Sequence, residues 1–185
     1  MNLPQIIDAL AQDHQFREHL TTWHTMPAKE PQYAEFPAGL EPKLVESFQA
    51  RGIPQLYTHQ ASAIEAVLND ENVCVVTPTA SGKTMCYNVP VLNRLMQNPN
   101  ARALYLFPTK ALSQDQVHEL KSIVDDLEVK IGTFTFDGDT PASARKAVRS
   151  AGHIVVTNPD MLHAGILPHH TIWIRLFENL EYVVI

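Results

Sequence analysis

The stretch that most constrains this chain is residues 73–84, where an apolar run is followed by a turn and then by Gly82-Lys83-Thr84. The apolar run predicts a buried strand, and the residues after the turn predict the start of a helix. Backbone N–H groups at such a junction face an anion. Lys83 would supply a charge to the outer phosphates of a nucleotide, and Thr84 a hydroxyl to Mg2+. Thr77 stands where the standard pattern has its first glycine, so an ordinary strand-to-helix turn is the alternative.

The composition is typical of a globular protein, because the 185 residues are 45% hydrophobic and 18% charged. No apolar run approaches the roughly 20 residues that cross a bilayer, and no secretory signal pattern opens the chain. We therefore expect no membrane contact and a cytosolic location. The net charge of −6 disfavours a compact basic nucleic-acid module, although local basic contacts inside a cleft remain compatible with it.

The cysteines and histidines do not predict a metal site or a disulfide. Cys74 and Cys86 flank the expected loop, and we interpret both as small buried apolar residues. His163, His169 and His170 lie near one another in an expected loop, but their spacing matches no recognised ligand pattern.

The first 50 residues differ from the rest of the chain. Apolar residues between positions 2 and 24 recur at helical spacing, which predicts one or two amphipathic helices that pack their apolar stripe in a core. Four prolines between positions 27 and 42 predict an extended connector. Pro42 is suited to the first turn of a further helix that carries Leu44 and Phe48. We therefore divide the chain into a helical extension with its connector, residues 1–50, and a domain of residues 51–185.

Strands and helices alternate from residue 72 onward. After the first strand, further short apolar strands are predicted at 102–107, 129–136, 153–157 and 180–185, with helical patterns between them. This order predicts an α/β fold with a largely parallel sheet that is covered by helices on both faces. Ligands of such sheets bind at the carboxyl ends of the strands. We therefore expect the turns at 77–82, 108–110, 137–140 and 157–160 to line one functional edge.

Gln60 lies in the first turn of a predicted helix just before the phosphate-loop strand. Its side-chain amide offers a donor and an acceptor, which match the N6 and N7 edge of adenine. Considered by itself, Gln60 is better interpreted as an exposed residue at a helix start.

The turns gain a common meaning when they are compared in order. They are L-Y-T-H-Q, T-P-T-A-S-G-K-T, P-T-K-A-L-S-Q-D-Q, G-D-T and T-N-P-D-M-L. This series resembles the first RecA-like motor domain of superfamily 2 helicases of the DEAD/DEAH type. The wording of the later motifs is similar to DNA repair helicases of the RecQ-like Hrq and MrfA type. The resemblance covers residues 51–185.

The resemblance implies a role for each motif. Gln60 would read adenine, Lys83 and Thr84 would be the catalytic residues, and Thr84 would also contact Mg2+. The implied residues for ATP binding are Gln60, Thr77, Pro78, Thr79, Ala80, Ser81, Gly82, Lys83 and Thr84. Turns that touch the nucleic-acid backbone in relatives contain Thr109, Lys110, Gly138, Asp139, Thr157 and Asp160. Such contacts position a strand without reading its sequence.

The resemblance implies the ATP-binding part of an ATP-dependent DNA helicase, in which ATP hydrolysis drives translocation along single-stranded DNA during repair. Its location would be the cytoplasm, at the nucleoid in a bacterium, or the nucleus in a eukaryote. An RNA helicase motor domain and a non-catalytic nucleotide-binding module are the alternatives. In the family an Asp-Glu pair would follow Ile185, and a later strand enters the sheet. We therefore expect a sheet incomplete at its C-terminal side, and 185 residues that bind ATP weakly without useful hydrolysis.

Overall fold

The computed structural model describes residues 2–27 and 30–185, which form two compact units, Met1–Pro31 and Gln32–Ile185. The first unit contains helices α1 (Leu3–Gln12) and α2 (His14–Glu18). Asn2 and Gln5 form a capping box that starts α1. The predicted helices are confirmed, but neither helix buries any of its own residues, so the expected core packing does not form within this unit.

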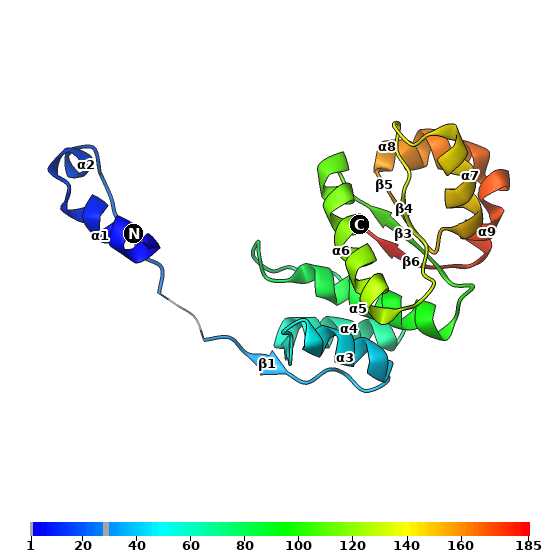
Figure 1. Cartoon of the computed structure of the whole chain (residues 1–185), viewed down its shortest axis with the longest axis horizontal. Coiled ribbons are helices and arrows are strands. Elements are labelled where there is room, and N and C mark those ends of the chain that lie inside the picture. Colours follow the sequence, from blue (N-terminus) through cyan, green and yellow to red (C-terminus); the bar gives the residue numbers. More distant parts are fainter. Residues whose placement is uncertain (1, 28–29) are drawn as a thin grey trace. The chain divides into compact units, whose positions relative to one another are not determined.

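The second unit is built on a four-stranded sheet in the order β4-β5-β3-β6 (Figure 1). Its strands are β3 (Arg102–Leu106), β4 (Thr133–Thr135), β5 (Ile154–Thr157) and β6 (Leu180–Val184). All three strand pairs are parallel, which confirms the predicted sheet type. Strand β4 is shorter than the predicted 129–136. A separate antiparallel pair joins β1 (Tyr33–Ala34) to β2 (Leu56–Tyr57).

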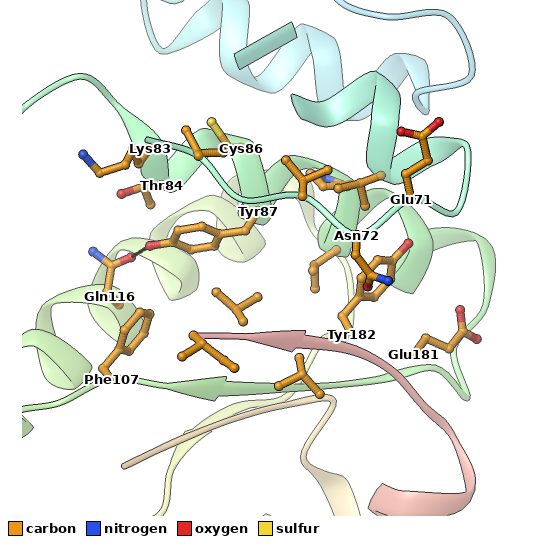
Figure 2. A pocket seen from close by; sticks show the side chains of 18 of the residues that line it. Glu71, Asn72, Lys83, Thr84, Cys86, Tyr87, Phe107, Gln116, Glu181 and Tyr182 are labelled. Carbon is orange, nitrogen blue, oxygen red and sulfur yellow. Dashed lines mark hydrogen bonds between the residues drawn. The ribbon is translucent and has the colours of Figure 1, made fainter. Parts of the chain in front are cut away.

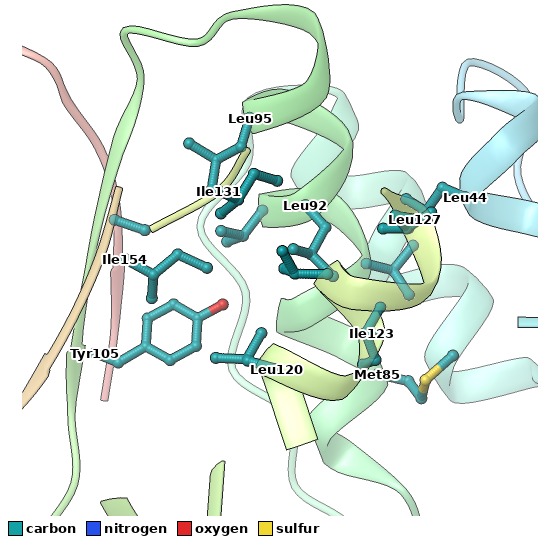
Figure 3. Packing of buried hydrophobic residues seen from close by; sticks show 14 of the residues in the cluster. Leu44, Met85, Leu92, Leu95, Tyr105, Leu120, Ile123, Leu127, Ile131 and Ile154 are labelled. Atoms are coloured by element: carbon teal, nitrogen blue, oxygen red, sulfur yellow. The ribbon is translucent and has the colours of Figure 1, made fainter. Parts of the chain in front are cut away.

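Both faces of the sheet are covered, as the apolar strands predict. Along β3, Ala103 and Tyr105 enter one hydrophobic cluster, whereas Leu104 enters the other. Side chains of consecutive strand residues point to opposite faces, so a strand that is buried on both faces serves two cores. In the first cluster, Tyr105 and Ile154 of the sheet pack against Leu92 and Leu120 (Figure 3).

The helices divide between these two faces. The first cluster includes residues of α3 (Pro42–Ala50), α4 (Thr58–Leu68), α5 (Lys83–Gln97) and α6 (Lys110–Leu127). The second face is covered by α7 (Ala142–Ala151), a π-helical turn η1 (Leu162–Ile166), a 3-10 segment η2 (Leu167–Trp173) and α9 (Ile174–Glu178). The short helix α8 (Pro159–Met161) joins β5 to η1. Among the described residues, none of the helices is long and apolar enough to span a membrane.

The predicted strand at 73–76 is wrong, because these residues have no strand conformation and Val76 is 89% exposed. An apolar run becomes a strand only where a neighbour pairs with its backbone. Among the described residues the sheet ends at β6, and the run pairs with neither β6 nor any other strand. Cys74, which we expected to be buried, is consequently exposed, whereas Cys86 on α5 is buried as expected.

The predicted domain boundary at residue 50 falls within the second unit. Helix α3 precedes this boundary, yet Leu44 and Phe48 are fully buried in the first cluster together with residues of α4, α5 and α6. The division into 1–50 and 51–185 stays a proposal about domain organisation.

Candidate functional site

The loop at 77–82 curls directly before α5. Ala80 and Gly82 have left-handed backbone angles, with φ of 60° and 73°. Inside the curl, the Lys83 ammonium donates hydrogen bonds to the carbonyl oxygens of Thr77 and Pro78, each at 2.8 Å. An ammonium has three N–H donors, so one donor remains for a ligand. The Thr77 and Ser81 hydroxyls lie 2.6 Å apart and close the base of the loop.

Two side chains at the start of α4 form hydrogen bonds with this loop. Gln60 is 4% exposed, so the interpretation that we favoured from this residue alone, an exposed glutamine at a helix start, is wrong. Its Oε1 accepts from the Tyr57 N–H at 2.8 Å, and its Nε2 donates to the Gly82 carbonyl at 2.9 Å. His59 Nε2 lies 3.0 Å from the Ser81 carbonyl. The amide still has one N–H and one lone pair for a ligand, so adenine recognition by Gln60 stays a prediction.

A cavity of about 740 Å³ opens beside the loop (Figure 2). Lys83, Thr84 and Tyr87 line it from α5, and Gln116 lines it from α6. Another side is formed by Glu71, Asn72, Val73 and Val75 of the unpaired run, opposite residues 181–185. The cavity therefore connects the phosphate-loop residues to the carboxyl edge of the sheet, which is where parallel sheets bind their ligands.

The turn before α6 lies at the same edge. The Thr109 hydroxyl accepts from the Leu112 N–H at 3.3 Å and caps the helix. Lys110 forms an ion pair with Asp139 at 2.6 Å, and this hydrogen bond raises the pKa of the exposed lysine. The ends of β3 and β4 are thereby joined by two of the residues that the sequence predicts for nucleic-acid contact.

The turn after β4 is held by Asp137. Its Oδ1 accepts from the Asp139 N–H and from the Thr140 hydroxyl, both at 3.0 Å. Gly138 at the tip is exposed, and a Cβ added there would meet nothing within 4 Å. Backbone atoms of this turn are therefore open to a large ligand.

The last two predicted nucleic-acid residues differ in their exposure to solvent. Thr157 is 1% exposed, and its hydroxyl donates to the Phe136 carbonyl at 2.6 Å, so its side chain serves the sheet. Asp160 is exposed in the first turn of α8, which Asn158 caps. Among residues 2–27 and 30–185, no group of three histidine, cysteine, aspartate or glutamate side chains is arranged for a metal ion.

Sequence reasoning missed three contributors to this region. His59 adjoins Gln60 at a helix start, and this position was a usable signal for a contact with the loop. Tyr87 and Gln116 are joined by a hydrogen bond across 29 positions, and no local pattern indicates such a pairing.

The sequence profile of the DEAD/DEAH box helicase family matches residues 57–185. The chain is 51% identical over 95% of its length to the uncharacterized ATP-dependent helicase YprA of Bacillus subtilis, of which the match covers 24%. It is 35% identical over its whole length to the ATP-dependent helicase hrq1 of Schizosaccharomyces pombe, of which 18% is covered. The chain thus spans about a quarter or less of these relatives.

The fold is also similar to a crystal structure of the helicase MrfA bound to DNA and AMPPNP. The TM-score is 0.90 at 48% sequence identity, and the match covers 99% of this chain and 25% of the MrfA chain. The parallel sheet, the loop before α5 and the family profile agree, and the chain belongs to the DEAD/DEAH box helicase family, in which it resembles the Hrq1 and MrfA helicases.

Proposed function

We propose that this chain is the ATP-binding part of an ATP-dependent DNA helicase that works in DNA repair. The observation that carries the proposal is the carboxyl edge of the parallel sheet, where the turns that begin α6, α7 and α8 lie and where one cavity is lined both by Lys83 and Thr84 and by the end of β6. A motor must couple its nucleotide site to its nucleic-acid site, because hydrolysis at one site changes binding at the other. The MrfA structure bound to DNA and AMPPNP supports this assignment. The repair role rests on the resemblance to Hrq and MrfA helicases.

In the nucleotide site, Lys83 pairs with the outer phosphates through its remaining N–H, and the N-terminus of α5 faces the anion. Gln60 reads the adenine edge, and its bond to the Gly82 carbonyl couples that reading to the loop. Thr84 fits Mg2+ because this residue lines the cavity and carries a hydroxyl oxygen, and Mg2+ takes few protein ligands beside phosphate oxygens and water. When bound, Mg2+ neutralises charge on the phosphates.

In the nucleic-acid site, the backbone of single-stranded DNA lies along the N-terminus of α6 and the turn at 137–140. Lys110 supplies the charge when a phosphate takes the place of Asp139 beside it, and Thr109 supplies its hydroxyl. Gly138, Asp139 and Asp160 contribute contacts to the sugar or through their backbone, because a carboxylate repels a phosphate. Thr157 contributes through its backbone only, since its hydroxyl is used inside the sheet. A protein that binds chromosomal DNA works in the cytoplasm at the nucleoid, or in the nucleus.

The first test replaces the loop lysine. Lys83→Ala removes a charge-assisted contact with phosphate, so the Kd for ATP rises roughly 10- to 150-fold in the full-length protein, measured with a fluorescent ATP analogue. Lys121→Ala, which changes an exposed lysine of α6, leaves the Kd at the parental value. Equal ATP binding by the Lys83→Ala variant and the parent would sink the assignment of the loop.

The nucleic acid is identified by ATP hydrolysis. Single-stranded DNA raises the ATPase rate of the full-length protein more strongly than an RNA of the same length and sequence. Stronger stimulation by RNA would replace the DNA assignment by an RNA helicase.

A further inference from the structure

A tyrosine of the phosphate-loop helix is bonded to a glutamine of the neighbouring helix. The Tyr87 hydroxyl donates to Gln116 Oε1 at 2.8 Å, and Figure 2 shows this bond on the wall of the cavity beside Lys83 and Thr84. Both side chains are half-buried. Among the residues that the structure describes, this is the one side-chain hydrogen bond between α5 and α6.

Each of the two bonded residues lies near the start of its helix, where we propose that a ligand binds. Tyr87 lies three positions after Thr84 on α5, so both side chains share one helix face. Gln116 lies fewer than two turns after Lys110, where α6 begins. A ligand at the start of either helix therefore acts within two turns of the bond.

The tyrosine ring is held in place by the sheet. It makes edge-on contact with Tyr105, at 5.5 Å between ring centroids, and a tilted contact with Phe107 at 6.4 Å. Such aromatic pairs favour specific geometries. Phe107 directly precedes the turn at 108–110, so the ring contacts the end of β3 as well as α6. Burial raises the pKa of the Tyr87 hydroxyl, with a smaller opposing effect from the Thr84 side chain, and the hydroxyl therefore remains a donor at neutral pH.

We propose that the Tyr87–Gln116 hydrogen bond is the link through which the nucleotide site at the start of α5 and the nucleic-acid site at the start of α6 affect each other. This inference rests on the proposed function, because it needs both ligands. A shift of α5 caused by phosphate moves Tyr87, and Gln116 transmits the shift to α6. The effect is reciprocal, since a coupling free energy between two sites acts equally in both directions. Tyr87 and Gln116 are positioning residues in this scheme, not catalytic ones.

The experiment measures coupling rather than binding alone. The Kd of the full-length protein for a fluorescent single-stranded DNA is measured by anisotropy, with and without a non-hydrolysable ATP analogue. The ratio of the two Kd values is the coupling factor. In Tyr87→Phe and in Gln116→Leu this factor moves toward one by about two- to tenfold, the range of one neutral hydrogen bond. The double variant shows no larger loss than either single variant, because both remove the same bond.

Tyr105→Phe is the matched control. It removes a hydroxyl from the adjoining ring. This hydroxyl donates to Asn88 Oδ1 of α5 at 3.1 Å, and among the described residues it forms no hydrogen bond to α6. It keeps the parental coupling factor. The inference is overturned when Tyr87→Phe and Gln116→Leu keep that factor, when Tyr105→Phe lowers it equally, or when the parent binds both ligands with a factor of one. A parent that binds neither ligand overturns the proposed function instead.

Discussion

Gly82 shows how one missing side chain shapes the nucleotide site. Its φ of 73° lies in the left-handed region, and a Cβ built there would come within 2.5 Å of Gln60 Nε2. The glycine thus permits the turn and also the contact between its own carbonyl and the Gln60 amide. The close approach explains why Gln60 is buried, although its position at a helix start predicts exposure.

Three glycine-to-alanine changes separate these two effects. Gly82→Ala suffers backbone strain and also displaces Gln60, so the free energy of unfolding falls by about 1.5–3.5 kcal/mol. Gly52→Ala suffers strain alone, because its φ is 85° and nothing lies within 4 Å, and costs about 1–2 kcal/mol. Gly138→Ala meets no neighbour and costs much less. Urea unfolding of the three variants measures this order, and a Gly82→Ala cost no larger than that of Gly52→Ala would contradict it.

Helix α5 organises the elements around it through a buried asparagine. Asn93 is 2% exposed, and its Oδ1 accepts from the Glu41 N–H at 2.7 Å. Its Nδ2 donates to the Gly39 carbonyl at 3.3 Å. These bonds satisfy backbone groups in the connector just before α3, so one residue of α5 holds the entry to α3 in place.

Asn93→Leu tests this attachment. Leucine has a similar size, but it leaves the Glu41 N–H and the Gly39 carbonyl without their partner, which costs about 1–3 kcal/mol for each buried group that water does not reach. We expect a lower free energy of unfolding and faster amide exchange at the start of α3. Asn69→Leu changes an exposed asparagine at the end of α4 and serves as the control. Equal stabilities of these two variants would show that α3 is held by its apolar contacts alone.

At the amino edge of the sheet, His153 joins the residues that precede β4 and β5. The ring Nδ1 accepts from the Gly132 N–H at 2.9 Å, and the backbone N–H of His153 donates to the Gly132 carbonyl at 2.8 Å. Burial lowers the pKa of His153, and the charge of Arg102 lowers it further. The accepting nitrogen must be unprotonated, so the folded molecule favours the neutral ring.

The sign of the resulting pH dependence follows from this lowered pKa. The unfolded chain takes up a proton near pH 6.5, before the folded protein does. The contribution of His153 to the free energy of unfolding is therefore complete above that pH, and it is lost as the pH falls through the lower pKa of the folded state. Urea midpoints of the parent and His153→Gln, compared at pH 7.5 and pH 5, measure this. The parent loses more on acidification, and equal losses would refute the role of His153.

Local pattern predicted much of this molecule. The strands at 102–107, 153–157 and 180–185, the parallel sheet and the start of α5 at Lys83 follow from apolar periodicity and the Gly-Lys-Thr motif. The run at 73–76 has the same apolar composition but pairs with no strand, so composition alone misassigned it. The length of β4 was overestimated because its pairing with β5 covers only Thr133–Thr135.

The candidate site shows the same division. Lys83, Thr84 and Lys110 stand at helix starts, and short-range pattern located them because capping and loop chemistry act between residues close in sequence. Three contacts of the site join residues that are 22 to 29 positions apart. They are the hydrogen bond of Gln60 to Gly82, the ion pair of Lys110 with Asp139, and the hydrogen bond between Tyr87 and Gln116. The sequence by itself therefore determined the elements and the chemistry at their ends. Only the tertiary structure decided which side chains meet, because packing of the helices on the sheet brings distant segments within hydrogen-bond reach.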